Sequence, residues 1–279
     1  VVPDSLEPGP GSGLWRAERL SKRQRNTLFA DILVAGRGNP ADANMLDHAI
    51  RIARREGGRI LGLRVISDQQ PEDARAARDV QRTFEQRCAA AGVAFASLVE
   101  EGVVSQRIAE RSIYADLVAL SLARRSALPT QTGVGSEFNT ILQHSRRPVL
   151  AVPDDANSPM DRALLAYDGS PKADEALFLA AYIAGAWQAQ LTVLVVGGSN
   201  DAYVAIERAK AYLDEQHVKA SVLNRTGNEA EQILATLAQT DANLLLIGSF
   251  GQRPLLQLLA GSTLNAVLRQ LQQPALICR

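Results

Sequence analysis

The sequence predicts an α/β protein made of two consecutive domains, each a doubly wound, mostly parallel sheet with helices on both faces. Short apolar segments typical of strands alternate with amphipathic segments typical of helices. This order runs through the chain twice, which indicates an internal duplication. A length of 279 residues also fits two domains of about 150 residues each.

Apolar and amphipathic segments define the first repeat. For example, Met45, Ala49, Ile50 and Ala53 recur at helical spacing. We expect strands at 30–35, 59–67, 93–101, 116–123 and 147–153, and helices at 40–57, 71–91, 105–114 and 136–145. Residues 1–29 precede this repeat as a linker or N-terminal extension, because their first part is rich in proline and glycine. Within the extension, the basic segment Trp15–Arg25 is interpreted as a solvated connecting helix.

The second repeat follows a break at Asp154–Met160. We expect strands at 162–170, 190–198, 219–227, 243–249 and 274–279, and helices at 172–187, 202–218, 229–240 and 262–272. The segment 32–40 aligns without gaps on 163–171, and 135–152 aligns on 261–278. The predicted domains are therefore 30–153 and 162–279.

Composition excludes several classes of protein. The chain has 30 Lys plus Arg and 30 Asp plus Glu, so no overall field favours nucleic acid or an anionic membrane. Two cysteines, Cys88 and Cys278, are too few for a disulfide framework and fit the reducing cytoplasm. The uncharged stretch Ala176–Asn200 changes from helix-like to strand-like composition at its middle, so we interpret it as a buried helix and strand rather than a membrane span.

Glycines follow the fourth strand of the second repeat. Gly248 and Gly251 come at the strand's end, and Gly261, Ser262 and Thr263 open the last helix. Ligands of open parallel sheets bind at the carboxyl ends of the strands. Glycine lets backbone approach a phosphate, and a helix N-terminus offers free N–H groups. The pattern predicts a nucleotide-phosphate site in the second repeat.

These residues resemble the universal stress protein (UspA-like) family, in its tandem two-domain type and its ATP-binding branch. The resemblance rests on the spacing Gly248-x2-Gly251-x9-Gly261-Ser262, on the segment AYDGSP, and on AEQILATLAQTDANLLLIGS. It covers nearly all of 31–153 and 162–279. It implies the adenine nucleotide alpha hydrolase-like fold, which is Rossmann-like.

The resemblance also implies roles for individual residues. Asp168 would face the nucleotide, and backbone around Val196 would read the adenine edge. The ribose and phosphates, with Mg2+, would be held by Gly248, Gly251, Gly261, Ser262 and Thr263. Arg253, in the connecting loop, is a candidate contact of the terminal phosphate. The last strands of the two repeats, Pro148–Val152 and Pro274–Cys278, would pair across a pseudo-twofold axis. No metal ligand is assigned.

The first repeat departs from the pattern at the same places. Arg37 stands where the second repeat has Asp168, while Ser121 and Arg124 stand in place of Gly248 and Gly251. We therefore expect that the first domain does not bind ATP in the family's manner. Arg37, Arg124 and Arg125 would either hold a lone anion at the helix that begins near Ser136 or stiffen an empty pocket.

Catalytic arrangements are mostly missing from the sequence. There is no GxxxxGK[ST] loop, HExxH motif or GxSxG elbow, so we expect at most weak ATP hydrolysis and assign no catalytic residue. His48, His144 and His217 are interpreted as surface or capping residues, and Cys278 as core. The segment from Gly36 to Ala41 fits G-x-G-x-x-A, which leaves dinucleotide binding as an alternative.

The leading hypothesis is a cytoplasmic regulatory protein of the stress response whose second domain binds an adenine nucleotide, ATP with Mg2+. It would form a pseudo-dimer within the chain, with a homodimer as a further option. An alternative is the soluble regulatory module of a larger protein, for instance a transporter, because Val1-Val2-Pro3-Asp4 repeats the ending of a last strand at 151–154.

Overall fold

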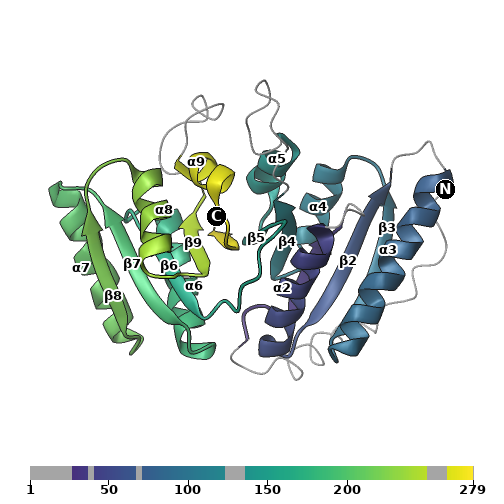
Figure 1. Cartoon of the computed structure of the whole chain (residues 1–279), viewed down its shortest axis with the longest axis horizontal. Helices are drawn as coiled ribbons and strands as arrows, with labels where there is room; N and C mark the ends of the chain where they lie inside the picture. Colours follow the sequence, from purple (N-terminus) through teal and green to yellow (C-terminus); the bar gives the residue numbers. More distant parts are fainter. Residues whose placement is uncertain (1–26, 37–40, 67–70, 123–135, 250–262, 279) are drawn as a thin grey trace, which may run out of the picture.

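The computed structural model describes residues 27–36, 41–66, 71–122, 136–249 and 263–278. In these residues the strands of both repeats form one ten-stranded sheet in the order β3-β2-β1-β4-β5-β10-β9-β6-β7-β8. The two repeats lie side by side and meet at the centre of the sheet (Figure 1). The predicted fold class is confirmed.

Every predicted strand and helix of the two repeats is present, with ends that shift by a few residues. The first half contains β1 (Asp31–Ala35), α2 (Ala41–Glu56), β2 (Arg59–Ile66), α3 (Pro71–Ala90), β3 (Ala94–Glu101), α4 (Val104–Ser112), β4 (Leu117–Leu122), α5 (Ser136–His144) and β5 (Val149–Pro153). The second contains β6 (Arg162–Ala166), α6 (Pro171–Ala186), β7 (Gln190–Val196), α7 (Asn200–Glu215), β8 (Ala220–Arg225), α8 (Glu229–Gln239), β9 (Leu244–Gly248), α9 (Thr263–Gln270) and β10 (Ala275–Cys278). The segment Trp15–Arg25 lies outside the described residues.

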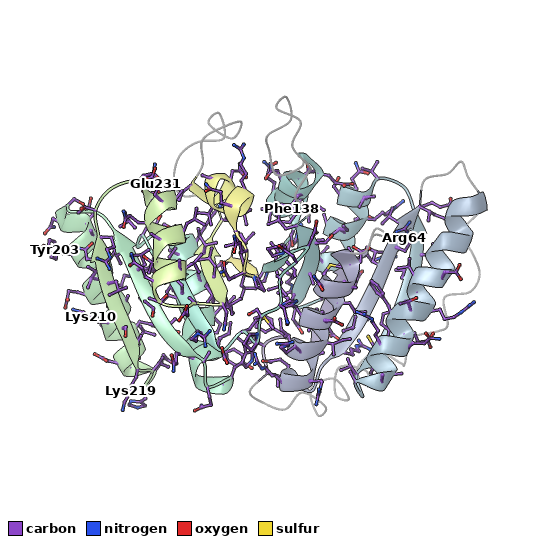
Figure 2. The ribbon with its side chains drawn as sticks, viewed as in Figure 1. Arg64, Phe138, Tyr203, Lys210, Lys219 and Glu231 are labelled. Atoms are coloured by element: carbon purple, nitrogen blue, oxygen red, sulfur yellow. The ribbon has the colours of Figure 1, made fainter. Side chains whose placement is uncertain are left out.

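The central strands are buried and the edge strands are largely exposed, as their sequences predict. The central strands β1, β5 and β10 are buried along their whole length, as expected for near-continuous apolar runs between two helical layers. The edge strands β3 and β8 are largely exposed or half-buried. On the outer side of the second half, Tyr203 and Lys210 project from α7 (Figure 2).

The helix α6 begins as capping rules predict, because the Ser170 side chain accepts a hydrogen bond from the N–H of Ala173 and Pro171 follows.

The two halves join through their last strands. Leu276 of β10 pairs with Leu150 of β5 in antiparallel register, while each of the other strand pairs in the sheet is parallel. The predicted pseudo-twofold pairing of these strands is thus confirmed. Two apolar cores run along the sheet, one on each face, and each contains residues from both halves. The halves therefore share cores as well as a sheet.

One face of α2 holds the linker between the halves. Asn44 donates to the carbonyl of Asp154, Arg51 to that of Ser158 at 2.6 Å, and Arg55 to those of Pro159 and Met160 at 2.7 and 3.1 Å. Asn44, Arg51 and Arg55 recur at helical spacing, so their side chains lie on one face. The side chains of α2 therefore hold the linker mainly through its backbone carbonyl groups.

His48 lies in the same row and is buried, so its interpretation as a surface or capping residue is wrong. Its Nε2 accepts the N–H of Ser158 at 3.2 Å, and its Nδ1 lies 2.7 Å from the carbonyl of Asn44. Because Ser158 donates, Nε2 carries no proton and Nδ1 donates to Asn44. The other two histidines, His144 and His217, are exposed, as expected. The helical spacing to Met45 and Ile52 places His48 beside the apolar face of α2, but its hydrogen-bond partner Ser158 is 110 residues away and could not be read from the local sequence.

The pairing of His48 makes stability depend on pH. Burial lowers its pKa below the ordinary 6.5, opposed by the Asn44 carbonyl, and Arg51 lowers it further while Asp47 raises it. The unfolded chain therefore binds a proton that the folded chain does not, so stability is full above pH 6.5 and falls below it. We expect a slope of up to about 1.4 kcal/mol per pH unit in urea unfolding below pH 6.5. His48→Gln should flatten this slope; a slope equal to that of the wild-type protein would contradict the assignment.

Candidate functional site

The carboxyl ends of three neighbouring parallel strands carry the predicted site residues of the second half. Asp168 follows β6, Val196 ends β7 and Gly248 ends β9, and β6 lies between the other two strands. The chain order reverses between β6 and β9, which is the switch point where open sheets bind ligands. The structure therefore brings Asp168, Val196 and Gly248 to one edge of the sheet. Gly251, Arg253, Gly261 and Ser262 lie outside the described residues.

A turn closed by a side-chain hydrogen bond follows β6 and positions Asp168. Its Oδ1 accepts the N–H of Ser170 at 2.9 Å, and the residue is exposed. Gly169 has φ of +75°, a conformation that side chains rarely adopt. Arg208 from α7 pairs with Asp174 at 2.5 Å and also donates to the carbonyl of Gly169. The turn holds one carboxylate oxygen and leaves the Asp168 side chain at the surface.

Packing against α6 requires a glycine at position 248, independently of any ligand. A Cβ at this position would lie 2.9 Å from the backbone nitrogen of Ala173 and 3.0 Å from the carbonyl carbon of Lys172. The first turn of α6 thus passes close to the end of β9, and only glycine leaves room for it. The glycine that predicts phosphate binding from the sequence is required here by helix packing, whatever ligand binds.

The first residue of α9 is hydrogen-bonded to an acid on α8 that the sequence analysis did not single out. Thr263, the first residue of α9, donates its hydroxyl to Oε2 of Glu229, the first residue of α8, at 2.5 Å. A carboxylate is stabilised near a helix N-terminus, so Glu229 uses part of the positive end that a phosphate would use.

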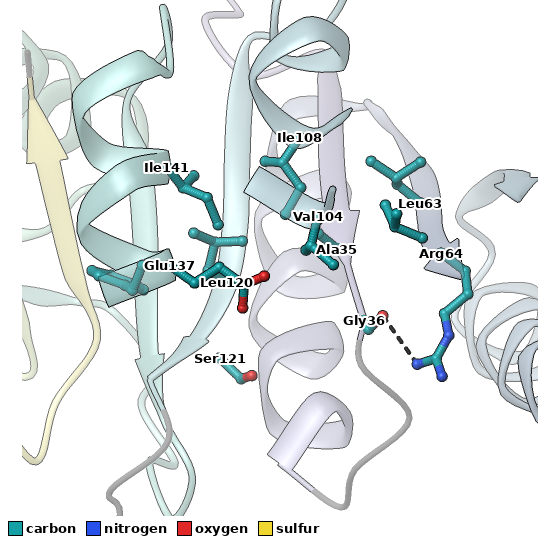
Figure 3. Close-up of a pocket in the computed structure, with 12 residues that line it drawn as sticks. Ala35, Gly36, Leu63, Arg64, Val104, Ile108, Leu120, Ser121, Glu137 and Ile141 are labelled. Atoms are coloured by element: carbon teal, nitrogen blue, oxygen red, sulfur yellow. Dashed lines mark hydrogen bonds between the residues drawn. The ribbon is translucent and has the colours of Figure 1, made fainter. Parts of the chain in front are cut away.

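A cavity of about 220 Å3 lies at the corresponding place in the first half. It is formed at the ends of β1, β2 and β4 and bounded by α4 and α5 (Figure 3). Eight apolar side chains form most of its wall: Ala35, Leu63, Val65, Val104, Ile108, Leu120, Phe138 and Ile141. Arg64, Ser121 and Glu137 are the polar side chains among the described lining residues, and Gly36 contributes backbone.

Two charged residues that the sequence did not indicate, Arg64 and Glu137, line this cavity. Arg37, Arg124 and Arg125, which were predicted to hold an anion or stiffen the pocket, lie outside the described residues. Arg64 extends from β2, away from the apolar wall, and donates to the carbonyl of Gly36 at 3.4 Å (Figure 3). Arg64 and Phe138 both belong to the first half (Figure 2). Glu137 points from the first turn of α5 into the cavity (Figure 3).

Comparison with known proteins places this chain in a family. The model of the universal stress protein family matches residues 29–153 and 197–279, so the chain belongs to that family, with the domain present twice. The predicted resemblance is confirmed. No curated protein gives a significant match.

Solved structures agree with this placement. A universal stress protein from Archaeoglobus fulgidus is 22% identical with a TM-score of 0.78, over 90% of this chain and 98% of that one. A candidate universal stress protein from Pseudomonas aeruginosa is 19% identical with a TM-score of 0.64, over 89% and 92%. The cytoplasmic domain of a prokaryotic cation chloride cotransporter is 14% identical with a TM-score of 0.56, over 90% and 95%. At such identities these likenesses establish the fold.

Proposed function

We propose that the second half of this tandem universal stress protein binds ATP together with Mg2+. The observation that carries the proposal is the meeting of Asp168, Val196 and Gly248 at the switch point between β6 and β9. The sequence adds the glycine spacing that opens α9. An adenine nucleotide fits such an edge because backbone groups and a helix N-terminus are both available there.

Mg2+ would be bound mainly by the phosphates of the nucleotide, with few ligands from the protein. The described residues contain no group of three side chains that could hold a metal ion. Mg2+ commonly uses one or two carboxylates together with the phosphates of its ligand. Asp168 and Glu229 are both exposed carboxylates at this edge, so a cation there would compensate negative charge as well as bind phosphate.

The role we assign is regulatory binding in the cytoplasm, in which nucleotide occupancy is read by a partner. Hydrolysis would be slow, because the chain lacks the common catalytic motifs.

Nucleic acid is an unsuitable partner for a chain with no net charge. None of the described helices has the length and apolar character needed to cross a bilayer. A homodimer would have to use surfaces other than the β5–β10 pair.

Equilibrium dialysis tests the nucleotide proposal. Wild-type protein should take up one ATP per chain in the presence of Mg2+, and excess NAD+ should not displace it. Gly251→Arg, which copies Arg124 of the first half, should reduce the affinity at least tenfold. Gly185→Arg adds the same side chain at an exposed site on α6 and should leave affinity unchanged. Absence of uptake, or equal uptake by Gly251→Arg, would overturn the proposal.

A second candidate function is a regulatory module of a larger protein. It is favoured by the likeness in fold to the cytoplasmic domain of a cation chloride cotransporter, at a TM-score of 0.56. Sequencing the coding region upstream of Val1 separates the two candidates. An open reading frame that continues into membrane-spanning segments would support the module, and a start codon close to Val1 would remove it.

A further inference from the structure

An exposed patch lies at the amino ends of β4 and β5, on the side of the sheet opposite to both candidate ligand sites. It consists of Ile113 and Tyr114 in the turn between α4 and β4, and of Arg146 and Arg147 in the turn between α5 and β5. Tyr114 is 62% exposed and Ile113 is 46% exposed. Arg146 is exposed and Arg147 is half-buried. We call these four residues the Tyr114 patch, and both turns lie wholly within the described residues.

Hydrogen bonds hold the two turns against each other. The guanidinium of Arg147 donates to the carbonyl of Ile113 at 3.3 Å. The N–H of Arg146 donates to the hydroxyl of Ser112 at 3.5 Å. Within the second turn, the hydroxyl of Ser145 donates to the carbonyl of Arg147 at 3.0 Å, and both serines are buried. The patch is therefore a fixed surface, so binding to it requires little ordering of the main chain.

In the described part of the chain, no acid pairs with the two arginines of the patch. The two acids closest in sequence to the first turn have partners of their own. Glu110 pairs with Arg107 at 2.8 Å, and Asp116 accepts the N–H of Asp31 at 3.0 Å. Arg147 has a single backbone carbonyl as acceptor for its five N–H donors. The patch thus offers unused donors suited to carboxylates, which arginine binds through two parallel hydrogen bonds.

The second half contains the same two turns with different side chains. Gln272 and Gln273 occupy the positions of the two arginines in the gapless match of 135–152 on 261–278, with the same degrees of exposure. Asp241 occupies the position of Tyr114, since they lie three residues before β9 and β4, respectively. The surface is aromatic and basic in one half but polar and acidic in the other. The fold therefore does not by itself require the Tyr114 patch.

We propose that the Tyr114 patch binds an acidic segment of another protein, in which an apolar side chain lies among carboxylates. The carboxylates pair with Arg146 and Arg147, and the apolar side chain packs on Tyr114 and Ile113. Tyrosine and arginine are residue types enriched in protein interfaces and among their strongest contributors. Because the patch lies away from both candidate ligand sites, the inference is independent of nucleotide binding.

Charge disfavours three other occupants of the patch. A second copy of the chain in a twofold contact would bring two pairs of arginines together. The basic segment Trp15–Arg25 of the same chain would be repelled in the same way. Two cations are also fewer than the about four to eight typical of segments that bind anionic lipid. A protein segment that supplies carboxylates is the better complement.

Peptide titration tests the proposal on the full chain. The probe is a peptide of about ten residues with Leu and Phe at its centre and Asp and Glu on both sides, followed through the methyl NMR signals of Ile113. We expect a dissociation constant below about 1 mM in about 0.05 M salt, and weaker binding in about 0.5 M salt. A peptide with Asn and Gln in place of the acids should bind at least about tenfold more weakly.

Variants that copy the second half provide the matched comparison. Arg146→Gln combined with Arg147→Gln should weaken binding of the acidic peptide at least about tenfold, and so should Tyr114→Asp. Arg54→Gln combined with Arg269→Gln removes the same charge from exposed sites elsewhere and should change binding less than about twofold.

Several results would refute the inference. The acidic peptide could leave the Ile113 signals unchanged, bind the patch variants as it binds the wild-type protein, or bind no better than its uncharged counterpart. Ile113 signals that shift with protein concentration alone would indicate self-association through the patch instead. A shift caused by phosphatidylglycerol vesicles but not by the peptide would indicate a membrane surface, and either finding overturns the proposal.

Discussion

Glu56→Ala is expected to lower the free energy of unfolding by about 3–5 kcal/mol, since it leaves four buried or part-buried donors without their charged acceptor. Glu56 ends α2 and is 3% exposed. Its carboxylate accepts the hydroxyl of Tyr182 at 2.8 Å and the indole N–H of Trp187 at 2.6 Å. It also accepts the backbone N–H groups of Leu28 and Phe29 at 2.9 and 3.3 Å. One side chain thus joins the N-terminal segment, the first half and the second half.

The measurement is urea unfolding of Glu56→Ala beside two other variants. Asp47→Ala removes an exposed carboxylate from the same helix, which pairs with Arg87, and should cost less than about 1 kcal/mol. Glu56→Gln keeps one acceptor oxygen and should fall between the two. If Glu56→Ala is no more harmful than Asp47→Ala, Glu56 does not hold the three segments together.

Gly248→Ala is expected to destabilise the second half by about 2–3 kcal/mol, because overpacking forces backbone to move. The added methyl group would meet the backbone of Lys172 and Ala173 rather than a movable side chain. The first half carries Ser121 at the equivalent position, so the close approach is particular to α6 and β9. The loss should already be complete in the absence of ATP, since packing alone causes it.

Gly185→Ala is the matched control for Gly248→Ala. Gly185 lies in α6 with no atom near the position of an added Cβ. Alanine there should raise the free energy of unfolding by up to about 1 kcal/mol, because glycine is a poor helix residue. Opposite signs in the two variants, measured by thermal and urea unfolding, are the expected result. A neutral Gly248→Ala would show that α6 can move away from β9.

The sequence was sufficient for most of the fold because its signals are local. The apolar run at 31–35 and the periodic apolar residues of α2 predict their elements without any knowledge of distant partners. The gapless match of 135–152 on 261–278 identifies the two last strands as equivalents, and their pairing followed from the family resemblance. Gly248 was predicted at the ligand edge by the rule that open sheets bind ligands at the carboxyl ends of their strands, whereas Asp168 and Val196 were assigned through the family resemblance.

Contacts between distant segments could not be predicted in the same way. Leu28 and Phe29, assigned to the N-terminal extension, pack against the second half, where the ring of Phe29 lies 6.3 Å from that of Tyr182. Glu56 stands in a basic last turn and resembles an ordinary exposed acid. Its burial depends on Trp187, 131 residues away. The hydrophobic periodicity of a single helix carries no information about a partner at that distance.

The candidate site was predicted less completely than the fold. Glycine spacing identified the phosphate end but not the acid Glu229 that bonds to Thr263. Arg64 and Glu137 lie outside the glycine motif, so the motif gives no signal for either residue. The first residues of α4 and α8 do carry a signal, because Val104 stands where the second half has Glu229.

The β5–β10 pair has an evolutionary consequence. In an assembly of two identical chains every substitution appears twice, so both pockets must tolerate it. Here a single polypeptide supplies both partners, and their association is independent of protein concentration. Each pocket can therefore acquire substitutions that would be harmful in the other, while the covalent connection preserves the joint architecture.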